Sequence, residues 1–286
     1  MIRKIPSQTA LRVALSLITL SAREKTRRLL PDGIGDATAK LLVASGMANP
    51  GLIRIFRRPG TVKLSMSLNP WMSGQFQAFA YRKAFCEQAV LDSIRVGATQ
   101  VIVLGAGFDT LCWRLASVHP NIKFFEIDYP ATSEAKMKGI GKMGQPANMQ
   151  MISADLSRQS LQQVLTGAPS WQQESRSVIV AEGLLMYLRP ADVLSLFKQT
   201  AASVGAESHF AFSHFYARRN GRANLGLFSD YALAGLRLLG EPVRWAIRKE
   251  KLPDFLEDTG WRPVAGSEQP HPDRAGIEGY VLLQRL

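Results

Sequence analysis

Cysteine and histidine are scarce in this sequence. The chain of 286 residues contains two cysteines, Cys86 and Cys112, and four histidines. Two cysteines cannot form a disulfide framework in a chain of this length, and neither has a second cysteine or a histidine at the spacing of metal ligands. We therefore expect reduced thiols and no metal site.

The sequence also lacks an apolar run long enough to cross a membrane. The nearest candidate, residues 10–20, is well short of the roughly 20 residues that a bilayer requires, and Arg12 interrupts it. It fits an amphipathic helix better. The basic start at Met1–Lys4 leaves a secretory signal as an alternative, although the cleavage pattern after the apolar run is poor. We expect a cytoplasmic protein.

Acidic residues are outnumbered: 23 aspartates and glutamates face 35 lysines and arginines, which gives a formal net charge of +12. Such an excess attracts nucleic acids, anionic membrane surfaces or acidic small molecules. Residues 1–60 hold 11 of the basic residues against three acidic ones, and these flank apolar stretches without forming a continuous stripe with aromatics. We interpret them as solvated helix faces, which makes a nucleic-acid partner the less favoured alternative.

Length and composition favour a single α/β domain over residues 1–286. A hydrophobic content of 46% and a charged content of 20% are ordinary for a globular protein. Helical periodicity in residues 7–47 and 75–94 predicts that residues 1–97 form a helical N-terminal cap. We expect residues 98–286 to form the α/β core that binds a ligand. The oligomeric state is left open.

A third glycine is missing from the most distinctive motif of the chain. The apolar run from Val101 to Leu104 predicts a buried parallel strand, Gly105 and Gly107 predict a tight turn, and a helix follows. The pattern is Gly-x-Gly-x-Asp, and Asp109 would repel the pyrophosphate of a dinucleotide. A cationic ligand fits better. A glycine turn that only packs the strand against the helix is the alternative.

Acidic residues follow three further predicted strands at a regular interval. The series Gly105, Asp128, Asp155 and Glu182 has spacings of 23, 27 and 27 residues, the length of a repeated strand and helix. Parallel strands connected in this way bring their carboxyl ends to one edge of a sheet. Three more strands complete a seven-stranded, mostly parallel sheet, at residues 209–213, 261–265 and 279–284.

The four acids select the chemistry of the ligand. A pocket ringed by Asp109, Asp128, Asp155 and Glu182 disfavours phosphate and favours hydroxyls, amines and positive charge. S-adenosylmethionine carries a ribose diol, an ammonium, a sulfonium and an adenine amino group, and no phosphate. We expect Asp128 to accept hydrogen bonds from the ribose, Asp155 to meet the adenine and Arg82 to pair with the carboxylate. Helix caps or solvated charges remain the alternative reading of these side chains.

Four segments, in this order and spacing, resemble the leucine carboxyl methyltransferase-like family of S-adenosylmethionine-dependent O-methyltransferases. They are VIVLGAGFDTLCWRL, FFEIDYPATSEAK, SADL and AEGLLMYL. The resemblance implies a class I methyltransferase (Rossmann-like) sheet with an N-terminal helical cap. It also implies methylation of a carboxylate or a hydroxyl, either on a protein C-terminal leucine or on a small metabolite of polyketide type. We expect a small-molecule acceptor.

The resemblance also assigns roles to single residues. Glu182 and Tyr187 match a motif that borders cofactor and substrate. The chain departs from the family pattern at residues 111–113, where an expected arginine is absent. The remaining matches are to cofactor-binding positions: Arg82, Gly105, Gly107, Asp128, Asp155 and Leu156.

The need for a general base depends on the acceptor, because a carboxylate reacts without one and a hydroxyl does not. His214, at the end of the predicted fifth strand, is the candidate base, since histidine titrates near neutrality. A hydrogen-bonded structural histidine is the alternative, and Tyr187 either contacts the substrate or packs its turn. Two other functions stay open: a nucleic-acid methyltransferase and a non-catalytic protein that binds S-adenosylmethionine.

Overall fold

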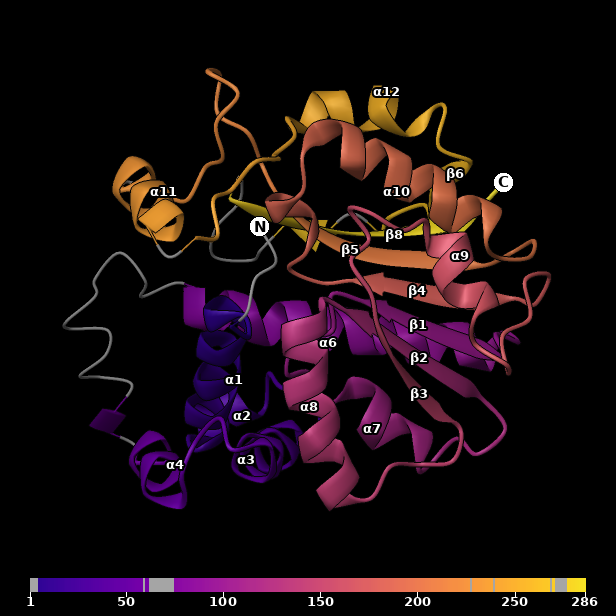
Figure 1. Ribbon diagram of the computed structural model, residues 1–286. Coiled ribbons are helices and arrows are strands. Elements are labelled where there is room, and N and C mark those ends of the chain that lie inside the picture. Colours follow the sequence, from indigo (N-terminus) through magenta and orange to yellow (C-terminus); the bar gives the residue numbers. More distant parts are fainter. Residues whose placement is uncertain are drawn as a thin grey trace.

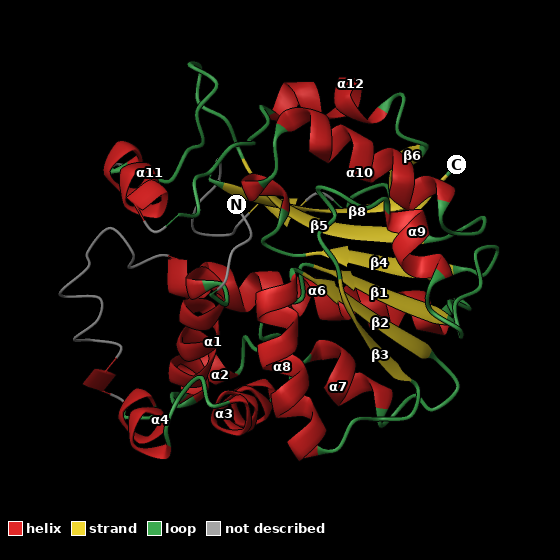
Figure 2. Ribbon diagram, viewed as in Figure 1, coloured by secondary structure: helices red, strands yellow, loops and turns green. Residues whose placement is uncertain are grey.

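The computed structural model describes residues 5–58, 60–61, 75–226, 228–238, 240–267, 269–270 and 277–286. A central sheet is covered by helices on both faces, and a group of N-terminal helices lies beside it (Figures 1 and 2). None of the helices in these ranges is long and apolar enough to cross a membrane. The same ranges contain no group of three or more His, Cys, Asp or Glu side chains that could hold a metal ion.

The sheet has the strand order β3-β2-β1-β4-β5-β8-β6, and the short β7 pairs with β8. The first five strands are parallel, whereas β8 runs antiparallel to both β5 and β6. The predicted seven-stranded, mostly parallel sheet is therefore confirmed by the seven strands of this order, and the short β7 adds an eighth strand. The strands are β1 (Gln100–Leu104), β2 (Lys123–Asp128), β3 (Met149–Ser153), β4 (Ser177–Ala181), β5 (His209–Phe215), β6 (Trp261–Pro263), β7 (Gln269–Pro270) and β8 (Glu278–Arg285).

The central strands β1 and β4 are buried along their whole length. Helices cover both of their faces, so both alternating sets of side chains must be apolar. One face packs against α9, α10 and α12, and the opposite face packs against α6, α7 and α8 (Figure 1). These helices are α6 (Gln75–Arg95), α7 (Leu111–Ala116), α8 (Pro130–Met143), α9 (Leu161–Thr166), α10 (Pro190–Ala202) and α12 (Leu252–Leu256).

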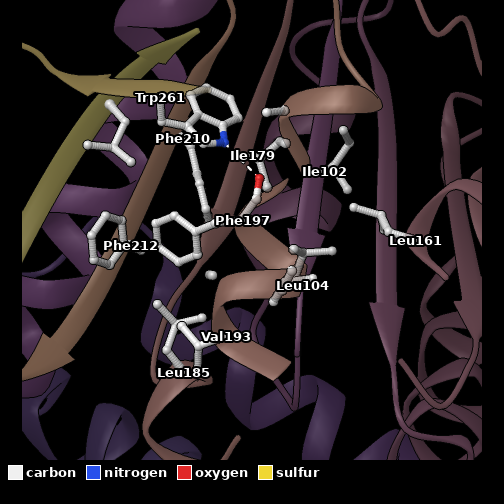
Figure 3. Packing of buried hydrophobic residues seen from close by; sticks show 14 of the residues in the cluster. Ile102, Leu104, Leu161, Ile179, Leu185, Val193, Phe197, Phe210, Phe212 and Trp261 are labelled. Atoms are coloured by element: carbon white, nitrogen blue, oxygen red, sulfur yellow. Dashed lines mark hydrogen bonds between the residues drawn. The ribbon is translucent and has the colours of Figure 1, made fainter. Parts of the chain in front are cut away.

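An aromatic cluster anchors α10 to the sheet (Figure 3). The ring of Phe197 lies 5.0 Å from that of Phe210 and 5.2 Å from that of Phe212, measured between centroids. The indole Nε1 of Trp261 donates a hydrogen bond of 3.0 Å to the carbonyl oxygen of Phe197. Aromatic pairs at such separations add about 0.5–1.5 kcal/mol each beyond the burial of their area. This packing joins α10 to β5 and β6.

The first four helices pack on other helices. They are α1 (Gln8–Ser21), α2 (Glu24–Arg27), α3 (Ile34–Ser45) and α4 (Pro50–Phe56). α3 contacts α8, and α1 contacts α3, α4 and α6. α6, which falls within the predicted cap of residues 1–97, also packs on β4, β5 and β8. It therefore connects the N-terminal helices to the sheet, and the division at residue 97 stays a prediction.

Gly105 and Gly107 form the turn between β1 and α7. Their φ angles are +66° and +52°, in the left-handed region that other residues adopt only at a cost. A Cβ atom on Gly105 would lie 2.8 Å from Cδ1 of Leu184. The turn therefore needs glycine here for its conformation and for the close approach of the loop after β4.

We expect Gly105→Ala to lower the free energy of unfolding by about 1–3 kcal/mol, because it combines an unfavourable φ with a steric clash. Urea denaturation of the ligand-free protein measures the change. Gly141→Ala is the matched control, since Gly141 is an exposed helical residue whose Cβ would meet no atom within 4 Å. That variant should gain about 0.5–1 kcal/mol. Equal effects of the two substitutions would contradict the argument.

Candidate active site

A cavity of about 560 Å³ lies at the carboxyl ends of the parallel strands. Gly105 follows β1, Asp128 ends β2, Asp155 comes after β3 and Glu182 follows β4, and all four line this cavity. Residues of α1 and α6 close it from the side of the N-terminal helices. The structure thus brings the predicted acids together at one edge.

Asp128 is held by the glycine turn. Its Oδ2 accepts a hydrogen bond from the backbone N–H of Gly107, and its Oδ1 accepts one of 2.6 Å from the N–H of Tyr129. Burial raises the pKa of Asp128, and the two backbone donors oppose that rise. The carboxylate is therefore fixed in orientation beside Gly107, where the cavity wall is backbone.

Asp155 and Leu156 differ in their placement. Asp155 lines the cavity and accepts hydrogen bonds from the backbone N–H and the Oγ of Ser157, at 3.0 and 2.6 Å. Leu156 is half-buried and packs against the aromatic side of the core, so it is not among the cavity-lining residues. Of this pair, the structure brings only Asp155 to the candidate site.

A buried network of five charges forms the floor of the cavity. Arg82 donates to Glu182 at 2.8 Å and to Glu278 at 3.0 Å. The Nζ of Lys83 lies 2.8 Å from Oδ2 of Asp109 and 2.8 Å from Oε2 of Glu182. All five side chains are less than one-tenth exposed. Two of the four predicted acids are therefore neutralised by cations of α6.

The network sets the protonation of its members. Burial acts to raise the pKa of Asp109, but the neighbouring cations together, with Lys83 foremost, outweigh it and hold that pKa at about 2. Asp109 also accepts hydrogen bonds from the N–H groups of Thr110 and Leu111, at 2.6 and 3.1 Å. Asp109 thus caps α7 and pairs with Lys83, which corrects its interpretation as a bare carboxylate facing the ligand.

Arg82 is constrained by its partners. Its Nε and Nη1 are engaged by Glu182 and Glu278, and its guanidinium lies 5.2 Å from the centre of the Phe79 ring. A Cβ on Gly183 would come within 3.2 Å of Nη2. Within the described residues Nη2 makes no hydrogen bond, so this nitrogen is available to a ligand. A ligand carboxylate that paired with two nitrogens of Arg82 would have to displace Glu182 or Glu278.

Tyr187 and Glu241 also line the cavity. Glu241 accepts hydrogen bonds from Oγ of Ser7 at 2.8 Å, from the N–H of Thr9 at 3.1 Å and from Oγ1 of Thr9. It therefore binds the N-terminus of α1. Burial, followed by the charge of Glu241, raises the pKa of Tyr187 to about 12, so its hydroxyl stays protonated at neutral pH.

His214 does not reach the cavity. It is fully buried on β5, its ring centroid lies 4.8 Å from that of Tyr216, and its Nε2 makes no hydrogen bond within the described residues. Alternate residues of a strand face opposite sides, and the neighbouring Phe215 is the one that lines the cavity. Burial lowers the pKa of His214 to about 4. The structure thus contradicts its placement as a base beside the acceptor.

Residues 14–201, well over half of the chain, match the profile of the family described as leucine carboxyl methyltransferase. The chain belongs to this family. The family that the four segments predicted is therefore confirmed, and the matched region contains most of the cavity-lining acids.

Curated relatives and solved structures agree. A protein from Mycolicibacterium paratuberculosis named as a putative S-adenosyl-L-methionine-dependent methyltransferase is 26% identical over 69% of this chain and 65% of its own length. The similarly named YktD from Bacillus subtilis is 29% identical over 27% of this chain and 26% of its own length. A crystal structure titled as a putative methyltransferase from Thermobifida fusca superposes with a TM-score of 0.59, at 14% identity, over 86% of this chain and 94% of that one. The last match supports the predicted class I methyltransferase fold.

The departure from the family pattern at residues 111–113 lies in α7. Leu111 and Cys112 are buried in the core on the α6 side of the sheet, and Trp113 donates a hydrogen bond of 2.9 Å from Nε1 to the carbonyl oxygen of Gly144. None of them lines the cavity. Arg114, which follows, pairs with Glu87 of α6. Residues 111–113 therefore contribute packing and do not form part of the cavity wall.

Three buried, charged lining residues were not predicted from the sequence: Lys83, Glu241 and Glu278. Lys83 had a local signal, because it adjoins Arg82 on a helix that was expected to lie over the site. Glu278 is 196 residues from Arg82, and Glu241 is 232 residues from Thr9. No local pattern identifies partners so distant.

The burial of His214 predicts that acid destabilises the protein. Its pKa is about 4 when folded and about 6.5 when unfolded, so the unfolded chain binds the proton more tightly. The contribution to stability is complete above pH 6.5 and is lost as the pH falls towards 4. Between pH 7 and pH 5, the wild type should lose about 2 kcal/mol more of its free energy of unfolding than His214→Gln does.

Urea denaturation at both pH values provides the measurement. His119→Gln, at a position that is only half-buried, is the matched control and should follow the wild type. If His214→Gln loses as much stability as the wild type on acidification, His214 is not the buried neutral side chain that the structure shows.

Proposed function

We propose that this protein is an S-adenosylmethionine-dependent methyltransferase that methylates an oxygen atom of a small molecule. The observation that carries the proposal is the convergence of the glycine turn, Asp128 and Asp155 on one cavity at the carboxyl ends of parallel strands. Ligands of open α/β sheets bind at this edge. Membership of the methyltransferase family supports the same conclusion.

The donor set fits the cofactor. Asp128 presents a half-buried carboxylate that suits the two ribose hydroxyls, and Asp155 is a second acceptor suited to the adenine amino group. Gly105 and Gly107 leave room for close approach of the ligand to the backbone. Nη2 of Arg82 is available for the methionine carboxylate. These groups are hydrogen-bond acceptors and one cation, as a phosphate-free nucleoside with a zwitterionic tail requires.

Bound S-adenosylmethionine supplies a methyl group already activated by its sulfonium. The protein therefore has to align the acceptor oxygen and exclude water. Tyr187 is suited to the first task, because its hydroxyl stays protonated and donates a hydrogen bond to an oxygen. The apolar residues of α1 and α6 that close the cavity serve the second.

The cavity favours a small acceptor over a nucleic acid. Its volume of about 560 Å³ lies within the roughly 300–1,000 Å³ typical of small-molecule sites. Acids line the interior, whereas two of the N-terminal arginines, Arg28 and Arg57, are exposed and pair with Glu24 and Asp36. Phosphate groups would be repelled from the interior. We expect the reaction to take place in the cytoplasm, where the two buried thiols stay reduced.

The cofactor assignment predicts a ligand-dependent melting temperature. S-adenosylhomocysteine at saturating concentration should raise the melting temperature of the wild type, because a ligand that binds only the folded state stabilises it. Asp128→Asn should lose most of this shift, since one carboxylate oxygen that can accept from the ribose is replaced by an amide donor. Differential scanning fluorimetry measures both.

Asp258→Asn, a change of the same kind at an exposed site outside the cavity, should keep the full shift. A shift that survives in Asp128→Asn would remove Asp128 from the cofactor site. The absence of a shift in the wild type would refute the assignment of the cofactor itself.

Transfer of a labelled methyl group tests the activity. We expect the enzyme, incubated with methyl-labelled S-adenosylmethionine and a lysate of its host, to place the label in the low-molecular-weight fraction, where mass spectrometry identifies the product. Label in protein or nucleic acid would overturn the small-molecule assignment. Cofactor binding without transfer to any fraction would indicate a non-catalytic binding protein.

A further inference from the structure

The outer face of α11 (Ser229–Leu238) is apolar and exposed. Tyr231 is 81% exposed and Leu238 is 88% exposed, and no other large apolar side chain of the described residues is as exposed as these two. Phe228, directly before the helix, is 51% exposed. Single apolar side chains on a surface need no explanation, but three on one short segment form a patch that indicates an interaction site.

The spacing of these three residues places them on one stripe of the helix. Phe228, Tyr231 and Leu238 follow one another at intervals of three and seven residues, which bring side chains to the same face. Leu233 lies on the opposite side, where it is buried in one cluster with Leu225. A surface helix normally turns polar residues to the solvent. α11 instead has an apolar face on its outer side as well as on its inner side.

The inner side of α11 borders the cavity. Leu236 of the helix lines the cavity, as do Leu225 before the helix and Pro242 after it. α11 stands at the end of the sheet to which the arrows of β4 and β5 point, which is the end that holds the cavity (Figure 1). A surface in contact with the outer stripe would therefore lie close to the candidate active site.

The chain around α11 is basic. Residues 217–248 contain six arginines and two acids. Of the acids, Glu241 is buried, and Asp230 pairs with the guanidinium groups of Arg218 and Arg222 at 2.8 Å each. The stripe therefore belongs to a positively charged part of the surface. The other four arginines are all exposed: Arg219, Arg237, Arg244 and Arg248.

An anionic membrane surface complements this combination better than a second copy of the chain does. In a symmetric dimer through α11, the arginines of one copy would face those of the other, and like charges repel. Anionic head groups attract the arginines, and aliphatic and aromatic side chains enter the boundary between head groups and acyl chains. Tyr231 suits that depth, because its ring is apolar and its hydroxyl can stay in water.

We propose that α11 docks the protein on a membrane surface that contains anionic lipids, with Phe228, Tyr231 and Leu238 in the lipid and the arginines at the head groups. The helix has 10 residues, too few to cross a bilayer, and it lies in the plane of the surface. Docking places the cavity beside the bilayer, where apolar molecules dissolve. The proposal goes beyond the proposed function, because docking requires neither the cofactor nor methyl transfer.

Co-sedimentation with vesicles tests the docking. The wild type should sediment with vesicles of equal parts phosphatidylglycerol and phosphatidylcholine, and should bind phosphatidylcholine alone at least about tenfold more weakly, because the arginines lose their anionic partners. Tyr231→Ser combined with Leu238→Ser should weaken binding to the mixed vesicles at least about tenfold, since two apolar side chains no longer enter the lipid.

Val96→Ser combined with Val118→Ser is the matched control. These exposed valines precede β1 and β2, so they lie at the edge of the sheet opposite the cavity, and the variant should bind as the wild type does. The charge is tested separately. Arg237→Gln should weaken binding about fivefold, whereas Arg27→Gln, at an exposed arginine of α2, should leave it unchanged.

Failure of the wild type to sediment with the mixed vesicles would overturn the proposal without any variant. Equal weakening by the two valine substitutions or by Arg27→Gln would assign the binding to the surface of the chain in general and would also overturn it. Light scattering adds a further test, because a dimer that the substitutions at Tyr231 and Leu238 convert to a monomer would make α11 an interface between copies. These measurements use no S-adenosylhomocysteine, so their failure leaves the proposed function standing.

Discussion

The ligand-binding edge depends on the contacts that Arg82 and Lys83 make from adjacent positions on α6. Together they reach the loop after β1 through Asp109, the loop after β4 through Glu182, and β8 through Glu278. Glu182 receives one cation on each oxygen and so joins the two halves of the network. A buried charge without a partner costs several kcal/mol, so these five groups are stable only as a set. The loops that border the cavity are fixed by this requirement.

The network also changes what the cavity offers a ligand. Lys83 and Arg82 satisfy Asp109 and Glu182, whereas Asp128 is held by the backbone N–H groups of Gly107 and Tyr129. Backbone donors orient a carboxylate and leave its charge in place. Of the four predicted acids, Asp128 therefore contributes most to the selection of a ligand without phosphate, since Asp155 lies 3.5 Å from the guanidinium of the exposed Arg158. The glycine turn then has two functions, because it bends the chain and also positions the carboxylate.

The parts of the fold that could be predicted are those with local signals. The sheet was predicted from two local patterns. Apolar runs such as Val101–Leu104 indicated the strands, and the regular spacing of the acids from Asp128 to Glu182 indicated the alternation of strand and helix. His214 shows the limit of this reasoning. His214 lies near the carboxyl end of β5, as predicted. Successive side chains of a strand face opposite sides of the sheet, however, and it is the neighbouring Phe215 that lines the cavity. Glu241 had no signal at all, because its partners are more than 230 residues away.

The lining of the cavity lies partly inside and partly outside the region that matches the family. The matched region, residues 14–201, contains the glycine turn and the acids from Asp109 to Glu182. Thr9, Phe215 and Glu241, which also line the cavity, lie outside it, whereas Tyr187, the residue proposed to hold the acceptor oxygen, lies inside it. The glycine turn and the acids suited to the cofactor therefore all fall within the family match, and the rest of the cavity lining falls only partly within it. The acceptor has to be inferred from the charge and shape of the cavity in this chain.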